Sequence, residues 1–129
     1  MAEKQAIRTE NAPAPFQGAP YNQAIAVGDL VFVAGQVGVE PATGQIVAGG
    51  IEAETEQVLR NVAAILEAAG SSMDRLVKTT VFLADLGDFA AMNEVYARHV
   101  GSVPPARSTF EVGALPAGAR VEIEAVGHR

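Results

Sequence analysis

The stretch that decides the fold reads IEAETEQVLRNVAAILEAAG over residues 51–70 and is followed closely by LVKTTVFL over residues 76–83. In the first part, apolar residues recur every three or four positions, which predicts an amphipathic helix over Ile51–Ala69. Glutamates crowd its first turns, where the helix dipole favours negative charge, and Gly70 is suited to end the helix. The second part is rich in β-branched and aromatic residues and predicts a central strand.

The chain before this helix reads as a meander of short strands. We expect strands at Gln5–Thr9, Asn22–Val27, Leu30–Val39 and Gln45–Val47. Gly28-Asp29 is a tight-turn signal between two of them. The run Leu30–Val39 is largely apolar, which is typical of a strand buried on both faces.

The chain after the central strand predicts one more helix and two more strands. Asp85 is the expected N-cap of a helix that Gly101 ends, with a buried stripe of Phe89, Met92, Val95, Tyr96, His99 and Val100. The strands are expected at Ala106–Val112 and Val121–Val126. The order ββ(β)αβαββ predicts an α+β fold in which one mixed sheet carries both helices on a single face. The other face then lacks a cover, which favours assembly with partner subunits.

Composition limits the class of protein. The 129 residues suit a single domain spanning 1–129, and the net charge of −6 comes without any cluster of basic residues. An acidic surface repels phosphate backbones, so nucleic acid is an unlikely partner. There is no cysteine, the first residues do not resemble a secretory signal, and no apolar run approaches the ~18 residues of a membrane span. A soluble, cytoplasmic protein without a membrane partner is therefore expected.

The histidines and glycines offer little chemistry by themselves. His99 lies on the apolar stripe of the second helix, where a partly buried, hydrogen-bonded side chain is a more common role than catalysis. His128 lies in the C-terminal tail and is expected to be solvated and mobile. Neither forms a metal-ligand pair with a carboxylate at a recognisable spacing. The Gly49-Gly50 pair either exposes backbone amides to an anion or is simply a turn, and the turn is favoured.

Two charged strands are more informative. Arg107, Thr109 and Glu111 share one face of their strand, and Glu122 and Glu124 share one face of theirs. The planar fork of an arginine can grip a small carboxylate, and a nearby glutamate can take a proton from water and return it. The alternative is an ordinary ladder of surface charges on a half-exposed sheet. Pattern alone leaves both interpretations open.

Segments spread over nearly the whole chain resemble the RidA (YjgF-like) family. They include ENAP at 10–13, GAPYNQA at 18–24, GDLVFVAGQV at 28–37, VKTTVFLADL at 77–86, MNEVY at 92–96, PARS at 105–108 and VEIEA at 121–125. No single piece is decisive, whereas their order and spacing together are specific. The resemblance implies a chorismate-mutase-like fold of the bacillus type, a homotrimer, and clefts between subunits.

The resemblance also implies an activity, the hydrolytic deamination of reactive 2-enamino or 2-imino acids to 2-keto acids and ammonia. Arg107 then binds the substrate carboxylate, and Glu122 holds or activates the attacking water. Tyr21 and Asn93 match positions that line the cleft, and Gly35 matches one whose backbone lies against the ligand. No metal or organic cofactor is implied.

Two departures from the family pattern concern the same cleft. Ala34 replaces a common serine, and Thr109 replaces a common cysteine beside the substrate. Both changes can retune substrate choice, and they motivate an alternative in which the cleft only binds or senses 2-keto acids. An endoribonuclease is disfavoured by the acidic charge. A true chorismate mutase is disfavoured because a dicarboxylate needs a second cationic group.

Overall fold

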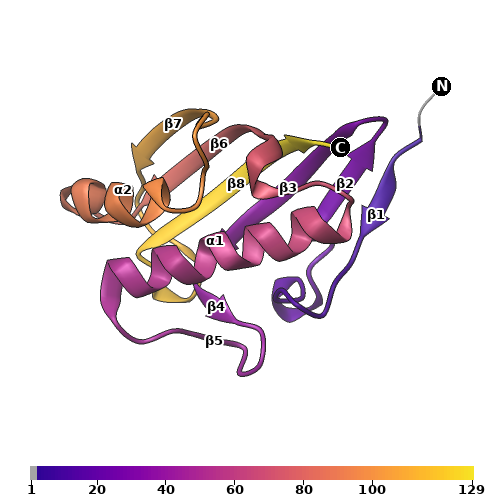
Figure 1. Cartoon of the computed structure of the whole chain (residues 1–129). Coiled ribbons are helices and arrows are strands. Elements are labelled where there is room, and N and C mark those ends of the chain that lie inside the picture. Colours follow the sequence, from indigo (N-terminus) through magenta and orange to yellow (C-terminus); the bar gives the residue numbers. More distant parts are fainter. Residues whose placement is uncertain (1–2) are drawn as a thin grey trace.

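The structure is a computed structural model that describes residues 3–129 as a six-stranded mixed sheet, a two-stranded ribbon and two α-helices (Figure 1). The elements are β1 (Gln5–Ile7), β2 (Ala24–Val27), β3 (Leu30–Val37), β4 (Val39–Glu40), β5 (Gln45–Ile46), α1 (Gly50–Ala68), β6 (Leu76–Leu83), α2 (Phe89–Ala97), β7 (Ala106–Glu111) and β8 (Val121–His128). The large sheet has the order β1-β2-β3-β8-β6-β7. Its neighbours are antiparallel except for the parallel pair β6/β7. The predicted α+β class is confirmed, and the last strand lies in the middle of the sheet.

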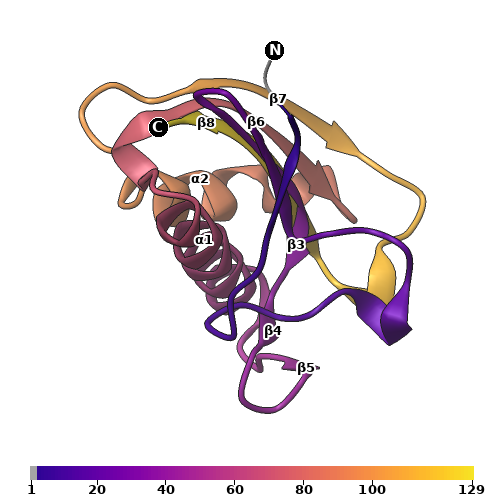
Figure 2. The ribbon, with the colours of Figure 1, turned by 90° about the vertical axis from the view of Figure 1, so that its right-hand side faces the viewer.

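Both helices cover the same face of the sheet, as predicted, which Figure 2 shows from the side. The apolar stripe of α1, including Leu59, Ile65 and Leu66, is fully buried against this face. The sheet contributes Val81 and Ile123, which have no exposed surface. Complete burial of such a side chain stabilises the fold by about 1.5–3 kcal/mol relative to its exposure. The core therefore lies between the helices and one face of the sheet.

The other face of the large sheet is open. Leu30 and Phe32 in β3 are each 44% exposed, while Val31 between them is buried. The prediction that Leu30–Val39 is buried on both faces is therefore wrong for the single chain. The predicted strand also divides at Gly38, where the chain turns into the ribbon β4/β5. A side chain at Gly38 would come within 2.9 Å of the Glu54 backbone, so α1 can approach this point closely only because it is glycine.

The helix boundaries differ from the prediction mainly in α2. The Asp85 carboxylate accepts a hydrogen bond from the Gly87 N–H at 2.8 Å, but it caps a 3-10 turn rather than the α-helix. The α-helix begins at Phe89 and ends at Ala97, before the expected Gly101. Phe89 is 40% exposed and does not belong to the buried stripe. None of the helices within residues 3–129 combines the length and the apolar character that crossing a bilayer requires.

The two histidines and the glycine pair have structural roles. His99 lies in the turn after α2, and its Nε2 is 2.9 Å from Oε1 of Glu56 in α1. The hydrogen bond from His99 lowers the pKa of Glu56. His128 is exposed, but it is the last residue of β8 and pairs with Leu30, so the expected tail is part of the sheet. Gly49 and Gly50 have φ angles of 121° and 77°, which favour glycine and agree with a turn before α1.

Candidate functional site

Arg107 lies in the edge strand β7, with its side chain on the helix-covered face. Its register partner in β6 is Thr79, which is 1% exposed. The guanidinium carbon lies 4.8 Å from the ring centroid of Tyr96 and 5.5 Å from that of Phe89. Among the residues that the structure describes, no carboxylate lies within ion-pair distance of Arg107. Its charge is therefore uncompensated, and its N–H donors are free to bind an anion such as a carboxylate.

Thr109 and Asn93 lie on the strand that carries Arg107 and on the helix that carries its two rings. Thr109 is on the same face of β7 as Arg107 and is the register partner of the buried Val81. In α2, the spacing of four and three residues places Phe89, Asn93 and Tyr96 on one side of the helix. Asn93 Oδ1 is buried and has no hydrogen-bond partner within residues 3–129. These five residues, Arg107, Thr109, Asn93, Phe89 and Tyr96, are called the Arg107 cluster below.

Glu122 lies on the open face of the sheet, in β8, directly above Gly35 of β3. A Cβ atom at position 35 would overlap the Glu122 carboxylate, so this position must be glycine for the carboxylate to lie where it does. Gly35 falls within the bulge where the register of β3 and β8 shifts, between Val33 and Gln36. Burial raises the pKa of Glu122, and the negative charge of Glu124 raises it further. Glu122 is therefore a stronger base than an ordinary surface glutamate.

Tyr21 lies close to the same part of the open face. With Gly35, it lines a hollow whose other residues include Pro13, Ala14 and Phe16. Its hydroxyl oxygen accepts a hydrogen bond from the Phe16 N–H at 2.9 Å, which closes the loop that carries the ring. The ring itself is 40% exposed. Tyr21, Gly35 and Glu122 are called the Glu122 cluster below.

The two clusters are separated within one chain. Glu122 is the register partner of Phe82, which also pairs with Phe110, and this set of side chains lies on the open face. Arg107 lies on the opposite face, and β6 separates β7 from β8. Two strand spacings amount to about 10 Å. A single copy therefore does not bring the Arg107 guanidinium and the Glu122 carboxylate to one small ligand.

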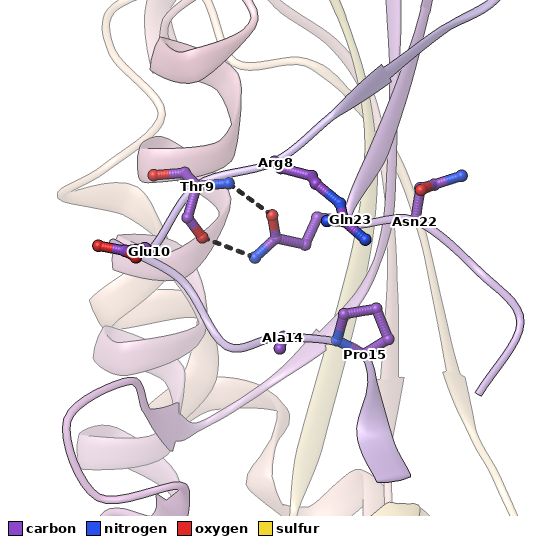
Figure 3. A pocket seen from close by; sticks show the side chains of 7 residues that line it. All are labelled: Arg8, Thr9, Glu10, Ala14, Pro15, Asn22 and Gln23. Carbon is purple, nitrogen blue, oxygen red and sulfur yellow. Dashed lines mark hydrogen bonds between the residues drawn. The ribbon is translucent and has the colours of Figure 1, made fainter. Parts of the chain in front are cut away.

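A separate hollow lies at the opposite edge of the sheet from Arg107 and is shown in Figure 3. It is lined by Arg8, Thr9, Glu10, Ala14, Pro15, Asn22 and Gln23. The buried Gln23 amide accepts from the Thr9 N–H at 2.8 Å and donates to the Thr9 carbonyl at 3.0 Å. It also donates to the carbonyls of Ala12 and Pro13. Gln23 thus ties the segment after β1 to β2, and its polar atoms are already occupied.

The sequence patterns identified Arg107 but not the rings that hold it. Phe89 and Tyr96 were assigned to the buried stripe of the second helix, together with Met92 and Val95. The signal available in the sequence was the spacing of the two rings, which lie four residues before and three residues after Asn93 on one helix. Periodicity cannot separate a ring that fills the core from a ring that faces a charged group.

Comparisons with known proteins identify the family of the chain. The family model described as Endoribonuclease L-PSP matches residues 9–128. A RutC family protein of Pyrococcus horikoshii is 51% identical over 126 residues, covering 98% of each chain. The 2-iminobutanoate/2-iminopropanoate deaminase of Mus musculus is 46% identical and covers 95% of this chain and 90% of that protein. The crystal structure of RidA from the Antarctic bacterium Psychrobacter sp. has a TM-score of 0.92 at 43% identity, covering 97% of this chain and 99% of that one. The chain therefore belongs to the RidA (YjgF-like) family, as its sequence segments indicated.

Proposed function

We propose that the protein hydrolyses reactive 2-imino acids, and the 2-enamino acids that tautomerise to them, to 2-keto acids and ammonia. The observation that carries the proposal is the presence of two groups in one fold: the Arg107 guanidinium, which has no ion-pair partner among residues 3–129, and the Glu122 carboxyl, whose pKa is raised. The mouse relative named 2-iminobutanoate/2-iminopropanoate deaminase supports the same chemistry. 2-Iminobutanoate and 2-iminopropanoate are the substrates we would test first.

The proposed reaction is the addition of water to C2 of the imine followed by loss of ammonia. Arg107 binds the substrate carboxylate through two parallel hydrogen bonds, which fixes the position of C2 next to it. Glu122 takes a proton from water as the oxygen bonds to C2, and the C2–N π electrons move to nitrogen. Glu122 returns that proton to nitrogen, which gives a carbinolamine. Glu122 then takes the proton of the new hydroxyl group and passes it to the nitrogen, so that the C–N bond breaks and ammonia leaves as the carbonyl forms.

The environment of Glu122 suits it to this role. A general base works best when its pKa lies near the working pH, and burial has moved the pKa of this carboxyl upward. Positioned proton transfer of this kind contributes about 10²- to 10⁴-fold to a rate. Imines also hydrolyse in water without help, so a modest acceleration is sufficient.

The proposal places the site between adjacent copies of a homotrimer. Arg107 and Glu122 lie on opposite faces of one sheet, so both can contact one substrate only if they belong to different copies. The open face supplies a reason for assembly, because it carries exposed rings such as Phe32 and Phe110. Each cleft would then combine the Arg107 cluster of one copy with the Glu122 cluster of the next.

The first test measures the decay of 2-iminobutanoate, generated in the cuvette by a separate amino-acid dehydratase or oxidase. The variant Arg107→Ala should lower kcat/KM by about 100-fold or more, because a charged bidentate anchor is lost. Glu122→Gln should lower kcat by about 100-fold, because the amide cannot accept the proton. Assembly should be unchanged in both, as measured by sedimentation. An unchanged rate in Arg107→Ala defeats the assignment.

Mixed assemblies test the location between copies. Arg107→Ala and Glu122→Gln subunits are co-produced with different affinity tags, and the doubly tagged trimers are purified. The purified mixed trimers should show roughly a third of the wild-type rate, because each contains one cleft of its three with both groups intact. Mixed trimers that are as inactive as their parents would place the site elsewhere.

Two alternative functions can be tested with the same purified protein. Calorimetric binding of 2-ketobutyrate with no acceleration of imine decay would favour a 2-keto acid sensor, the alternative that Ala34 and Thr109 motivate. Cleavage of single-stranded RNA that disappears in Arg107→Ala would favour the activity for which the family model is named. The net charge of −6 disfavours this second outcome.

A further inference from the structure

The guanidinium of Arg107 lies over two rings of different character. Tyr96 is 5% exposed and its centroid is 4.8 Å from the guanidinium carbon. Phe89 is 40% exposed and its centroid is 5.5 Å away. Tyr96 is thus the inner, fixed ring and Phe89 the outer ring that solvent or a ligand can reach.

The inner ring is held in place by the strand next to β7. The Tyr96 hydroxyl and Thr79 Oγ1 lie 2.6 Å apart in a buried hydrogen bond. Thr79 is also the residue that pairs with Arg107 across β6 and β7. The backbone neighbour of Arg107 therefore fixes the ring over which its own side chain lies. Arg107, Thr79 and Tyr96 thus form a ring of contacts: Arg107 pairs with Thr79 in the sheet, Thr79 is hydrogen-bonded to Tyr96, and Tyr96 contacts the Arg107 guanidinium.

An aromatic support differs from the more common carboxylate partner in one respect. A carboxylate would hold the guanidinium but neutralise it and occupy its donors, whereas a ring attracts the cation through its face and leaves the N–H donors in the guanidinium plane free. Arginine side chains also have several rotatable bonds, so confining one before binding lowers the entropy lost when a ligand is bound. Tyr96 can thus orient Arg107 while keeping it available to an anion.

We propose that Tyr96, locked by Thr79, is the positioning residue for Arg107, which sets the orientation of its donor fork toward the substrate carboxylate. This inference rests on the proposed function, since it concerns the same carboxylate anchor. Tyr96 acts through Arg107 and does not itself take part in the chemical step.

The test compares two variants. Tyr96→Leu removes the aromatic ring, and Tyr96→Phe keeps the ring but removes its hydrogen bond to Thr79. For imine hydrolysis, Tyr96→Leu should raise KM about tenfold with little change in kcat, because the lost interaction binds ground state and transition state alike. Tyr96→Phe should raise KM about threefold. The double variant Thr79→Val/Tyr96→Phe should behave like Tyr96→Phe, because both ends of the hydrogen bond are then removed together.

Val95→Ala is the matched control for a purely structural effect. Val95 is the neighbouring buried residue of α2, 2% exposed, and is outside the Arg107 cluster. Its truncation should lower the unfolding temperature and leave KM unchanged. An equal rise in KM for Val95→Ala, or an unchanged KM for Tyr96→Leu, overturns the inference.

A second readout is independent of turnover. The side-chain ¹⁵N relaxation of Arg107 Nε should report a rigid N–H bond in the wild type and a mobile one in Tyr96→Leu. If Arg107→Ala abolishes activity but the Tyr96 variants change neither KM nor this mobility, only the inference fails. If the wild type neither hydrolyses imines nor binds 2-ketobutyrate, the proposed function fails and the inference with it.

Discussion

The two faces of the large sheet differ in how complete they are within one chain. On the helix-covered face, Val31, Val81 and Ile123 have no exposed surface. On the open face, the neighbouring Phe32 is 44% exposed and Phe110 is 53% exposed. The helices α1 and α2 bury the side chains of the first face, whereas the open face presents apolar side chains to solvent. The difference teaches that one chain completes its core on one face of the sheet and leaves the other face available for contact with a partner.

The candidate site is divided between the same two faces. The Arg107 cluster is built by β7 and α2 on the covered face, and it is complete once the chain has folded. The Glu122 cluster lies on the open face, where its carboxylate is only partly buried. In the proposed site, the fold of one copy therefore orients Arg107, whereas Glu122 needs a second copy to bring it to the same ligand.

The largest expected effect comes from placing a charge on each face in turn. Val31→Asp should prevent folding, because a buried carboxylate without a partner costs roughly 3–5 kcal/mol. Phe32→Asp, one residue along β3, should leave the circular dichroism spectrum unchanged but yield monomers without deaminase activity. Sedimentation and the imine assay check both variants. Assemblies of wild-type mass from Phe32→Asp would show that the open face is not the contact between copies.

A smaller effect is expected from Gly35→Ala, which tests the Glu122 cluster alone. The new Cβ would displace the Glu122 carboxylate, while the backbone at this position is not in the left-handed region and accepts alanine. We expect kcat to fall about tenfold, since the base is moved from its place. The affinity for 2-ketobutyrate should change less, because Arg107 is untouched. Gly113→Ala, whose added Cβ would meet nothing within 4 Å, is the control, and an equal loss of kcat there would contradict the explanation.

The smallest expected effect concerns pH. Glu124→Gln removes one of the two causes that raise the pKa of Glu122, so that pKa should fall. Since the base must be ionised, the acid side of the kcat/KM profile should move to lower pH, and the shift should shrink in high salt. Glu111→Gln, on the other face, is the control and should leave the profile in place. A profile that does not move in Glu124→Gln would mean that another group limits the rate at low pH.

The same raised pKa has a consequence for stability. The folded-state pKa of Glu122 lies above its unfolded value, so its contribution to stability is present at low pH and is lost as pH rises through the folded pKa. Glu122→Gln should therefore be more stable than the wild type at neutral pH, although its kcat should be lower. Chemical denaturation at two pH values measures this difference.

Much of the fold was predictable because the patterns are local. The apolar stripe of Ile51–Ala69 predicted α1 to within one residue at each end, and Leu76–Leu83 is β6 as predicted. The errors occurred where a tertiary contact decided the outcome. The strand divides at Gly38, a position where α1 approaches too closely for a side chain. Phe89 is exposed beside Arg107 although its spacing suits a buried stripe.

The sequence by itself determined which residues share a face, since side chains alternate along a strand. It placed Arg107 with Thr109 and Glu122 with Glu124, and it identified the family through the order of its segments. Only the tertiary structure decided that these two pairs lie on opposite faces of one sheet. The physical reason is that alternation leaves the two faces equivalent until strand order and register assign one of them to the helices.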